Sequence, residues 1–153
     1  MKALPSTAEE RARTSLHQEV PLDAGPERIY DILMDSKQFA SFTGLPATID
    51  PNVGGSFSLF GGMIVGRNVE LARGRLIVQA WRPADWDPGL YSIVRFVLKP
   101  AGSGSVVVLD HSGFPPGDFD HLSIGWKEHY WQRLTTYLAT HAGSTDRAPG
   151  RGA

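Results

Sequence analysis

The sequence contains no cysteine, and this absence excludes several kinds of chemistry. A disulfide framework, a thiolate nucleophile and a cysteine-ligated zinc site all require thiols that this chain does not have. The composition suits a reducing compartment, and we expect a cytoplasmic protein.

The chain also has no long apolar run and no strong charge of either sign. The opening residues, MKALPSTAEERARTS, have no apolar core of signal-peptide length, and no stretch approaches the roughly 20 apolar residues of a membrane span. The net charge is −1, with 41% hydrophobic and 20% charged residues. These values predict a soluble globular protein that binds neither nucleic acid nor membranes, and that is a monomer or a weak homodimer.

The length of 153 residues fits one domain with a sizeable core. Residues 14–141 carry the hydrophobic patterns and are predicted to form that domain. Residues 1–13 and 142–153 are rich in polar residues, glycine and proline, and are predicted to be flexible tails.

The hydrophobic pattern changes twice along the predicted domain. Residues 15–20 alternate as an opening strand, and two helical segments follow, the second over 36–42. Pro26 suits the first helical turn, after Asp23 or Gly25 as the cap. From residue 47 the pattern predicts six further strands joined by short turns, which requires antiparallel pairing. The order predicts an α+β fold, with one antiparallel sheet and its helices on one face.

The last predicted helix carries an unusual amount of aromatic surface. Six large side chains fall within an arc of roughly 140° when each residue advances by about 100°: Trp126, Tyr130, Trp131, Leu134, Tyr137 and Leu138. An aromatic stripe at helical spacing usually belongs to the core, so we expect it to pack on the sheet.

Two polar residues interrupt the inward face of this helix. On the same wheel, Ser123 and Lys127 lie within the apolar arc, and a lysine in a dry core costs several kcal/mol. They predict a wet or ligand-filled space beside the N-terminal end of the helix and solid core beside its C-terminal end. The alternatives are a later helix start, or a lysine stem that reaches to the rim.

Six segments, in order from residue 20 to residue 138, resemble a known family. They are VPLDAGPERIYDILMDS, FTG, VGGSFSLFGGMIVGRNVEL, LIVQAWRPADWDPGLYSIVRFVLKP, LDHSGFP and GWKEHYWQRLTTYL. The more specific matches are Trp81-Arg82 before Asp85-Trp86, and Gly125-Trp126. The sequence resembles the START-like (SRPBCC) superfamily with the helix-grip fold of the birch-pollen allergen, and within it the family named after the activator of HSP-90 ATPase. The eukaryotic cochaperones of that family carry a large additional N-terminal domain, for which this chain has no room.

The resemblance implies a curved sheet wrapped on the C-terminal helix, with a mostly apolar cavity between them. Its lining would come from Phe42, Phe60, Trp81, Trp86, Phe96, Phe114, Trp126 and Tyr130, with His111 facing in or out according to the strand register. The alternative is a core that these side chains fill completely.

Catalytic and metal-binding patterns are weak. Histidines stand at positions 17, 111, 121, 129 and 141, but none forms an i,i+4 pair, and His121 and His129 lie about 80° apart on the wheel. We expect no metal, no cofactor and no assigned catalytic residue. His111 could act as an acid or base if it faces the cavity, whereas its neighbour Ser112 must point to the opposite face.

Three functions remain open, since the superfold hosts many. The first, which we favour, is binding of a small apolar or aromatic ligand. The second is action on an HSP-90-like chaperone, with charged contacts such as Arg73, Arg75, Glu128 and Arg133. The third is a polyketide cyclase-like enzyme, or a self-resistance protein that sequesters a metabolite.

Overall fold

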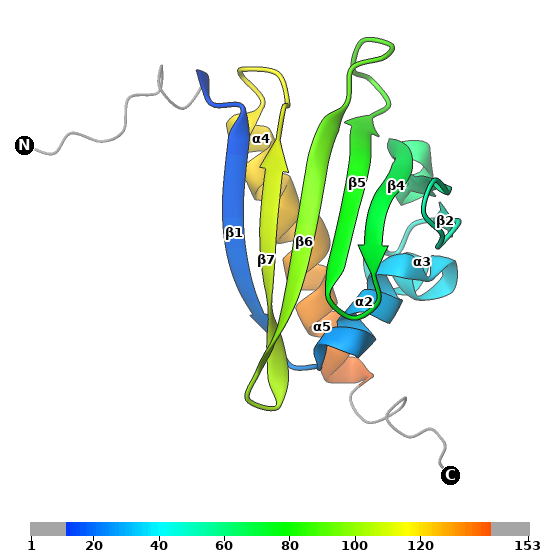
Figure 1. The fold of residues 1–153 in the computed structure, drawn as a ribbon, viewed down its shortest axis with the longest axis vertical. Coiled ribbons are helices and arrows are strands. Elements are labelled where there is room, and N and C mark those ends of the chain that lie inside the picture. Colours follow the sequence, from blue (N-terminus) through cyan, green and yellow to red (C-terminus); the bar gives the residue numbers. More distant parts are fainter. Residues whose placement is uncertain (1–11, 142–153) are drawn as a thin grey trace, which may run out of the picture.

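The computed structural model describes residues 12–141, which form a curved seven-stranded antiparallel sheet with helices on one face (Figure 1). The strands lie in the order β1-β7-β6-β5-β4-β3-β2. The elements are β1 (Ser15–Leu22), α2 (Pro26–Met34), α3 (Ser36–Thr43), β2 (Thr48–Ile49), β3 (Ser56–Leu59), η1 (Phe60–Gly62), β4 (Ile64–Ala72), β5 (Leu76–Pro83), β6 (Ser92–Ala101), β7 (Gly104–Ser112), α4 (Phe119–Gly125), η2 (Trp126–Trp131) and α5 (Gln132–Thr140). The predicted α+β class and element order are confirmed. Most of the two predicted tails lies outside the described residues.

The two short helices begin where the sequence predicts, and α3 extends one residue beyond the predicted end at residue 42. Gly25 is the N-cap of α2 and Pro26 its first residue. At the start of α3, the Asp35 carboxylate accepts a hydrogen bond from the Gln38 backbone N–H at 2.9 Å. Gly44 ends α3 in the left-handed conformation (φ 79°), which a residue without Cβ adopts at little cost.

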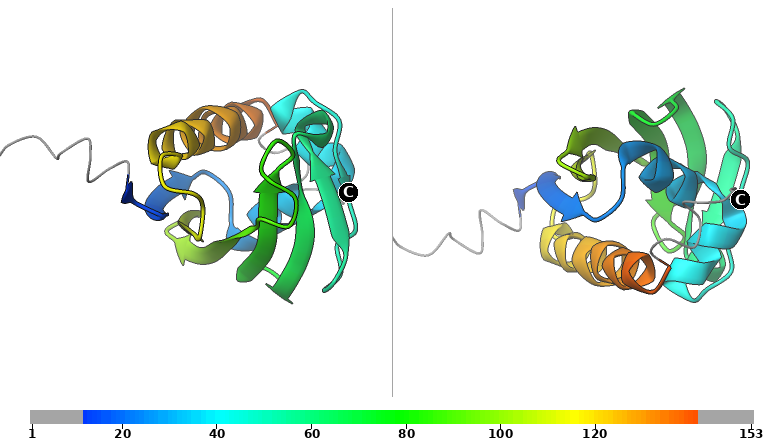
Figure 2. Two further views of the ribbon diagram at one scale, coloured as in Figure 1. Left: turned by 90° about the horizontal axis from the view of Figure 1, so that it is seen from above. Right: turned by 90° about the horizontal axis from the view of Figure 1, so that it is seen from below.

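The C-terminal helix, made of α4, η2 and α5, crosses the concave face of the sheet (Figure 2). Alternate residues of the central strands point toward it, as the two-residue period of a strand requires. On β6 these are Val94, Phe96 and Leu98, all buried. The core therefore lies between the sheet and the helices.

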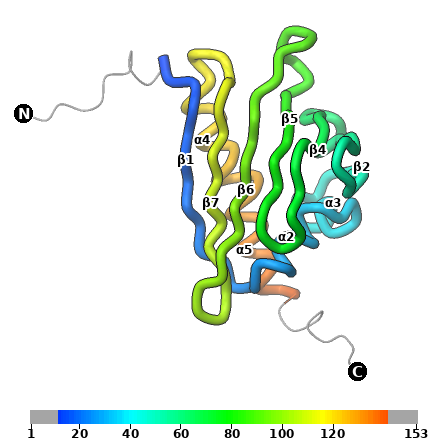
Figure 3. The backbone as a smooth tube through the Cα atoms, viewed as in Figure 1, coloured from blue at the N-terminus to red at the C-terminus, as the bar shows by residue number. Residues whose placement is uncertain are grey.

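The first strand closes one edge of the sheet by pairing with the last one. Leu16 lies opposite His111, and Val20 lies opposite Val107. Figure 3 shows β1 beside β7, although the two are far apart in the sequence. This pairing brings β1 next to the C-terminal helix, where Gln18 bonds the Ser123 carbonyl oxygen.

The strand β4 bends sharply where it passes β3 and β5. Its register shifts between Asn68 and Glu70. Two positions earlier, a Cβ on Gly66 would lie 2.0 Å from the Ala80 carbonyl oxygen and 2.6 Å from the Phe57 ring. Only glycine fits this crossing, because no side chain can share the space.

The turn at Gly61-Gly62 joins β3 to β4 and is wider than a two-residue hairpin turn. The turn η1 contains two left-handed glycines, Gly61 (φ 67°) and Gly62 (φ 97°). Before them, Phe60 also has a positive φ, 55°, the only non-glycine residue in the described range to do so. Such a backbone costs about 1–3 kcal/mol and is found where the surroundings hold a side chain in a required position.

Candidate ligand cavity

The C-terminal helix contains a wide turn at its centre. Over η2 the helix is π-helical, and the Gln132 N–H bonds the carbonyl oxygen of Lys127, five residues back. In such a turn each residue advances by less than the roughly 100° of an α-helix. Residues before the turn are therefore rotated relative to residues after it. As a result Leu122, Trp126 and Tyr130 align with Leu134 on the buried side.

The same rotation makes one sequence-based expectation wrong. Lys127 does not point inward: it is exposed and lies beside β1. Ser123 is half-buried, and its carbonyl oxygen accepts a hydrogen bond from the Gln18 amide at 3.1 Å. A regular helical wheel turns both side chains farther toward the core than they lie in the structure. The buried positions that it predicted farther along the helix, including Leu134 and Leu138, are confirmed.

The aromatic side chains of the helix pack mainly on the protein's own sheet. The Trp126 ring stacks between Trp81 of β5, at a centroid distance of 5.6 Å, and Trp131, at 5.9 Å. The ring centroid of Tyr130 lies 4.3 Å from that of Trp126 and 5.6 Å from that of Phe60. The cluster joins the helix, the sheet and η1, and it forms one wall of a cavity.

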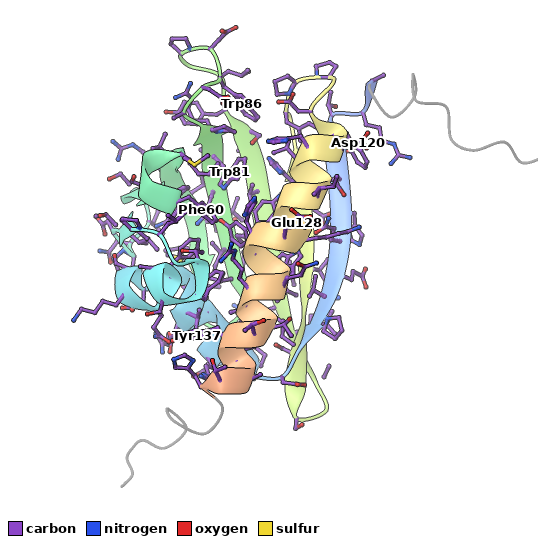
Figure 4. The ribbon with its side chains drawn as sticks, turned by 180° about the vertical axis from the view of Figure 1, so that it is seen from behind. Phe60, Trp81, Trp86, Asp120, Glu128 and Tyr137 are labelled. Carbon is purple, nitrogen blue, oxygen red and sulfur yellow. The ribbon has the colours of Figure 1, made fainter. Side chains whose placement is uncertain are left out.

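This cavity has a volume of about 400 Å³ and opens on the side of the helix away from β1. Its described lining consists of Leu45, Phe60, Met63, Ile64, Trp81, Pro83, Ala84, Asp85, His121, Leu122, Gly125, Trp126, His129 and Tyr130. Figure 4 shows Phe60, Trp81 and Trp86 on this side of the helix. Among the predicted binding residues, Phe60, Trp81, Trp126 and Tyr130 lie in the wall.

The other predicted binding residues do not line this cavity. They are Phe42, Trp86, Phe96, His111, Phe114, Ser123 and Lys127. Several of them support the wall from behind: Phe96 contacts Trp126 at 5.7 Å between centroids, and Trp86 contacts Trp81 at 6.4 Å. Phe42 packs deeper in the core, 4.8 Å from Phe39.

A loop between β5 and β6 forms the mouth of the cavity opposite the helix. The Arg82 guanidinium donates hydrogen bonds to the carbonyl oxygens of Trp86, of Asp87 at 3.1 Å and of Leu90 at 3.2 Å. These bonds fix the loop, which brings Pro83, Ala84 and Asp85 to the lining. The Ala84 N–H also donates to the Met63 carbonyl oxygen at 2.8 Å, which joins the loop to η1.

Sequence patterns missed most of these rim residues. Leu45, Met63 and Ala84 stand in connections between elements, where hydrophobic periodicity gives no signal. A regular helix separates His121 and His129 by about 80°, so the helical wheel does not predict that both face one cavity. The wide turn reduces that separation and brings both to the same cavity.

His111 lies behind the cavity wall as a buried, neutral side chain. Its Nε2 lies 2.8 Å from the Ser92 hydroxyl, and its Nδ1 accepts a hydrogen bond from Trp126 Nε1 at 3.0 Å. Because the Ser92 hydroxyl donates to the Trp81 carbonyl oxygen at 3.0 Å, it must accept from His111, which assigns the proton to Nε2. Burial lowers the pKa of His111 to about 3. Both ring nitrogens are occupied, so this imidazole positions Trp126 and has no free lone pair for base catalysis.

Two buried polar atoms near the wall have no hydrogen-bond partner in the described structure. They are Trp81 Nε1 and Gln79 Oε1. The Trp81 ring N–H lowers the pKa of the Tyr130 hydroxyl, which acts against the effect of burial. Burial dominates and raises the pKa of Tyr130, so its hydroxyl remains protonated. Gln79 faces a void of about 10 Å³ behind Tyr130, the size of one water molecule.

A second depression lies on the opposite side of the helix, against β1. It is lined by Gln18, Glu19, Val20, Lys127, Trp131, Gln132, Thr135 and Thr136. Most of these side chains are polar, and the trough, although larger at about 660 Å³, is more open to solvent than the aromatic cavity. Trp131 Nε1 donates to Gln18 Oε1 at 2.8 Å across its floor. The aromatic cavity is therefore the better candidate for an apolar ligand.

Residues 12–141 contain neither a cluster of metal ligands nor a helix that could span a membrane. No group of three or more histidine, aspartate or glutamate side chains there could hold a metal ion. No helix in the same range is long and apolar enough to cross a membrane.

Comparison with known proteins identifies the family. Residues 23–139 match the family described as Activator of Hsp90 ATPase homolog 1-like protein. The chain belongs to this family. The "Activator of 90 kDa heat shock protein ATPase homolog" of Dictyostelium discoideum is 33% identical over 115 residues, 74% of this chain and 29% of that protein. The homolog 2 of Mus musculus is 28% identical over 124 residues, 81% of this chain and 38% of that protein. The chain thus spans about a third of the length of these family members.

Solved structures share the fold. An HSP90 activator from Plasmodium falciparum superposes with a TM-score of 0.78 at 24% identity, over 82% of this chain and 96% of that one. CalU16 from Micromonospora echinospora gives a TM-score of 0.70 at 18% identity, over 81% of this chain and 73% of that one. The helix-grip architecture expected from the sequence is confirmed.

Proposed function

We propose that the protein binds a small apolar or aromatic molecule in the cavity between the C-terminal helix and the sheet. The observation that carries the proposal is the aromatic-walled cavity of about 400 Å³, which is within the usual size of ligand sites. Its wall offers flat apolar surfaces from Phe60, Trp81 and Trp126.

The lining offers few groups for covalent catalysis. Among the described residues, the lining contains no serine, threonine or lysine, so no hydroxyl or amine nucleophile of these types faces the cavity. His111, the acid–base candidate of the sequence, lies behind the wall with both nitrogens bonded. A ligand held there would be bound by apolar contact and oriented by the polar rim.

A cavity-filling pair of variants tests this proposal. Ala84 is exposed at the mouth and lines the cavity, whereas Ala139 is exposed on α5, outside the lining. The uncharged fluorescent probe N-phenylnaphthylamine is expected to bind the wild type, and Ala84→Phe is expected to weaken its affinity by about tenfold, or roughly 1.4 kcal/mol. Ala139→Phe should leave the affinity within about twofold. Equal binding by all three proteins would place the probe elsewhere.

A second proposed function is action on an HSP-90-like chaperone in the cytoplasm. The family and the names of its members support it. In the structure, two of the suggested contact residues are engaged within the protein: Arg73 pairs with Asp31 at 3.0 Å, and Arg133 donates to the Thr43 carbonyl oxygen at 3.3 Å. Glu128 remains exposed on the helix (Figure 4).

Addition of the protein to a purified HSP-90 homologue is expected to raise ATP turnover in proportion to complex formation. Glu128→Lys would reduce this stimulation if the exposed side of the helix forms the contact. Ala84→Phe, which fills the cavity, should leave the stimulation unchanged if it does not depend on a bound ligand. Unchanged turnover at saturating protein would contradict the chaperone role.

A further inference from the structure

Three residues of the C-terminal helix, His121, Gly125 and His129, form a stripe along the cavity, which we call the histidine slot. All three belong to the cavity lining. They are spaced four residues apart, one helical turn each, and the wide turn η2 keeps the third in line with the first two. The slot therefore has an imidazole at each end and a glycine between them.

The glycine leaves open space inside the slot. A Cβ placed on Gly125 would meet no atom closer than His129 Cδ2, at 3.9 Å. Packing thus does not require glycine here, although glycine destabilises a helix interior by about 0.5–1 kcal/mol relative to alanine. The missing side chain instead lets a ligand approach the helix backbone between the two imidazoles.

One imidazole is held in place by the aromatic wall. The His129 ring meets Phe60 edge to face, with the centroids 6.2 Å apart. Phe60 in turn contacts Phe39 and Tyr130, both at 5.6 Å between ring centroids, and these contacts hold it in its left-handed conformation. The strained residue of η1 therefore orients a polar group at the cavity mouth.

The polar groups of the slot suit an oxygen anion. Imidazole N–H groups donate to carboxylate or sulfonate oxygens, and such charge-assisted hydrogen bonds are stronger than neutral ones. The lining contains no lysine or arginine, so in the described lining only the histidines can carry positive charge. Asp85, on the opposite loop, is the one acidic side chain of the lining and opposes an anion.

We propose that the cavity selects apolar acids, with the hydrocarbon body against Phe60 and Trp126 and the acidic group in the histidine slot. This inference rests on the proposed ligand-binding function and specifies the class of ligand. A neutral or basic aromatic ligand is the competing outcome, and Asp85 would then provide its polar contact.

Two probes with the same ring skeleton separate these outcomes. Anilinonaphthalene sulfonate carries an anionic group, whereas N-phenylnaphthylamine has none. The wild type is expected to bind the sulfonate more tightly. The double variant His121→Gln/His129→Gln should weaken sulfonate binding about ten times more than it weakens binding of N-phenylnaphthylamine, since only the sulfonate bonds the imidazole N–H groups. His17→Gln, an exposed histidine outside the cavity, is the matched control.

A variant that should gain affinity guards against loss through misfolding. Asp85→Asn removes the opposing charge and is expected to strengthen sulfonate binding several-fold, which a damaged fold would not do. If the double variant binds the sulfonate as the wild type does, or if Asp85→Asn weakens it, the slot does not select acids. If the wild type binds neither probe, the proposed ligand-binding function itself fails.

Discussion

The two flanks of the C-terminal helix are built differently. On the flank toward β1, hydrogen bonds fix the spacing: Gln18 donates to the Ser123 carbonyl oxygen at 3.1 Å and accepts from Trp131 Nε1 at 2.8 Å. On the cavity flank the helix contacts η1 through rings, such as Phe60 with His129 and Tyr130. Hydrogen bonds demand one distance, whereas ring contacts tolerate a range. The β1 flank therefore holds the helix at a fixed distance, whereas the contacts on the cavity flank constrain that distance less tightly.

The largest expected effect tests whether the cavity ends before α5 begins. Leu134 is fully buried one turn beyond Tyr130. Leu134→Ala should lower the free energy of unfolding by about 2–5 kcal/mol, the usual cost of truncating a leucine in solid core. Urea unfolding measures this value, with the exposed neighbour Thr135→Ala as a control expected to change it by less than about 0.5 kcal/mol. A decrease of less than about 1 kcal/mol in the free energy of unfolding for Leu134→Ala would mean that the cavity continues beneath α5.

A medium effect concerns His111, which supports the helix from below through Trp126. The folded protein binds a proton at this imidazole only near pH 3, whereas the unfolded chain does so near pH 6.5. The stabilising contribution is thus complete above pH 6.5 and declines as the pH falls toward 3. The expected slope is about 1.4 kcal/mol per pH unit.

Urea titrations between about pH 4 and 5.5 measure this slope, and His111→Gln should reduce it by about 1.4 kcal/mol per pH unit, the value for one proton. The pKa of His17 shifts the opposite way, raised by its hydrogen bonds to Asp110 and Glu19, so its contribution is complete below the unfolded pKa and is lost at higher pH. The contributions of the two histidines to stability therefore change over different pH ranges. An identical slope in wild type and variant would mean that His111 is protonated in the folded protein.

The smallest expected effect contrasts the flanks directly. Because Lys127 is exposed beside β1, Lys127→Met should change the free energy of unfolding by less than about 0.5 kcal/mol. It should also leave the affinity for both naphthalene probes within about twofold. A marked loss of sulfonate binding would show that the lysine, on the β1 flank, contributes to the acid site.

Most of the architecture could be predicted from the sequence because it depends on local signals. Pro26, Asp35 and Gly44 mark the helix ends, and two-residue alternation marks the strands. The cavity wall was predicted in part: aromatic residues on strands and the helix, such as Trp81 and Trp126, follow these periods. Rim residues from loops, including Leu45 and Met63, have no such period and could be placed only by the folded structure.

The π-helical turn explains the main error. Nothing in Trp126–Trp131 distinguishes a wide turn from a regular one, because the extra residue is stabilised by packing rather than by local propensity. Its effect is long-range along the helix. It moves Lys127 out to solvent and brings His121 into line with His129, which a regular wheel separates.

The edges of the sheet affect how these molecules behave at high concentration. An open strand edge can template pairing with another chain, and native sheets prevent this with short strands, charges and proline. One edge here, β2, is only two residues long. The other, β1, carries Glu19 exposed and ends near Pro21, which has no N–H to offer a neighbour. Both edges are thus poor templates, and the protein can keep an open sheet without recruiting strands from other molecules into aggregates.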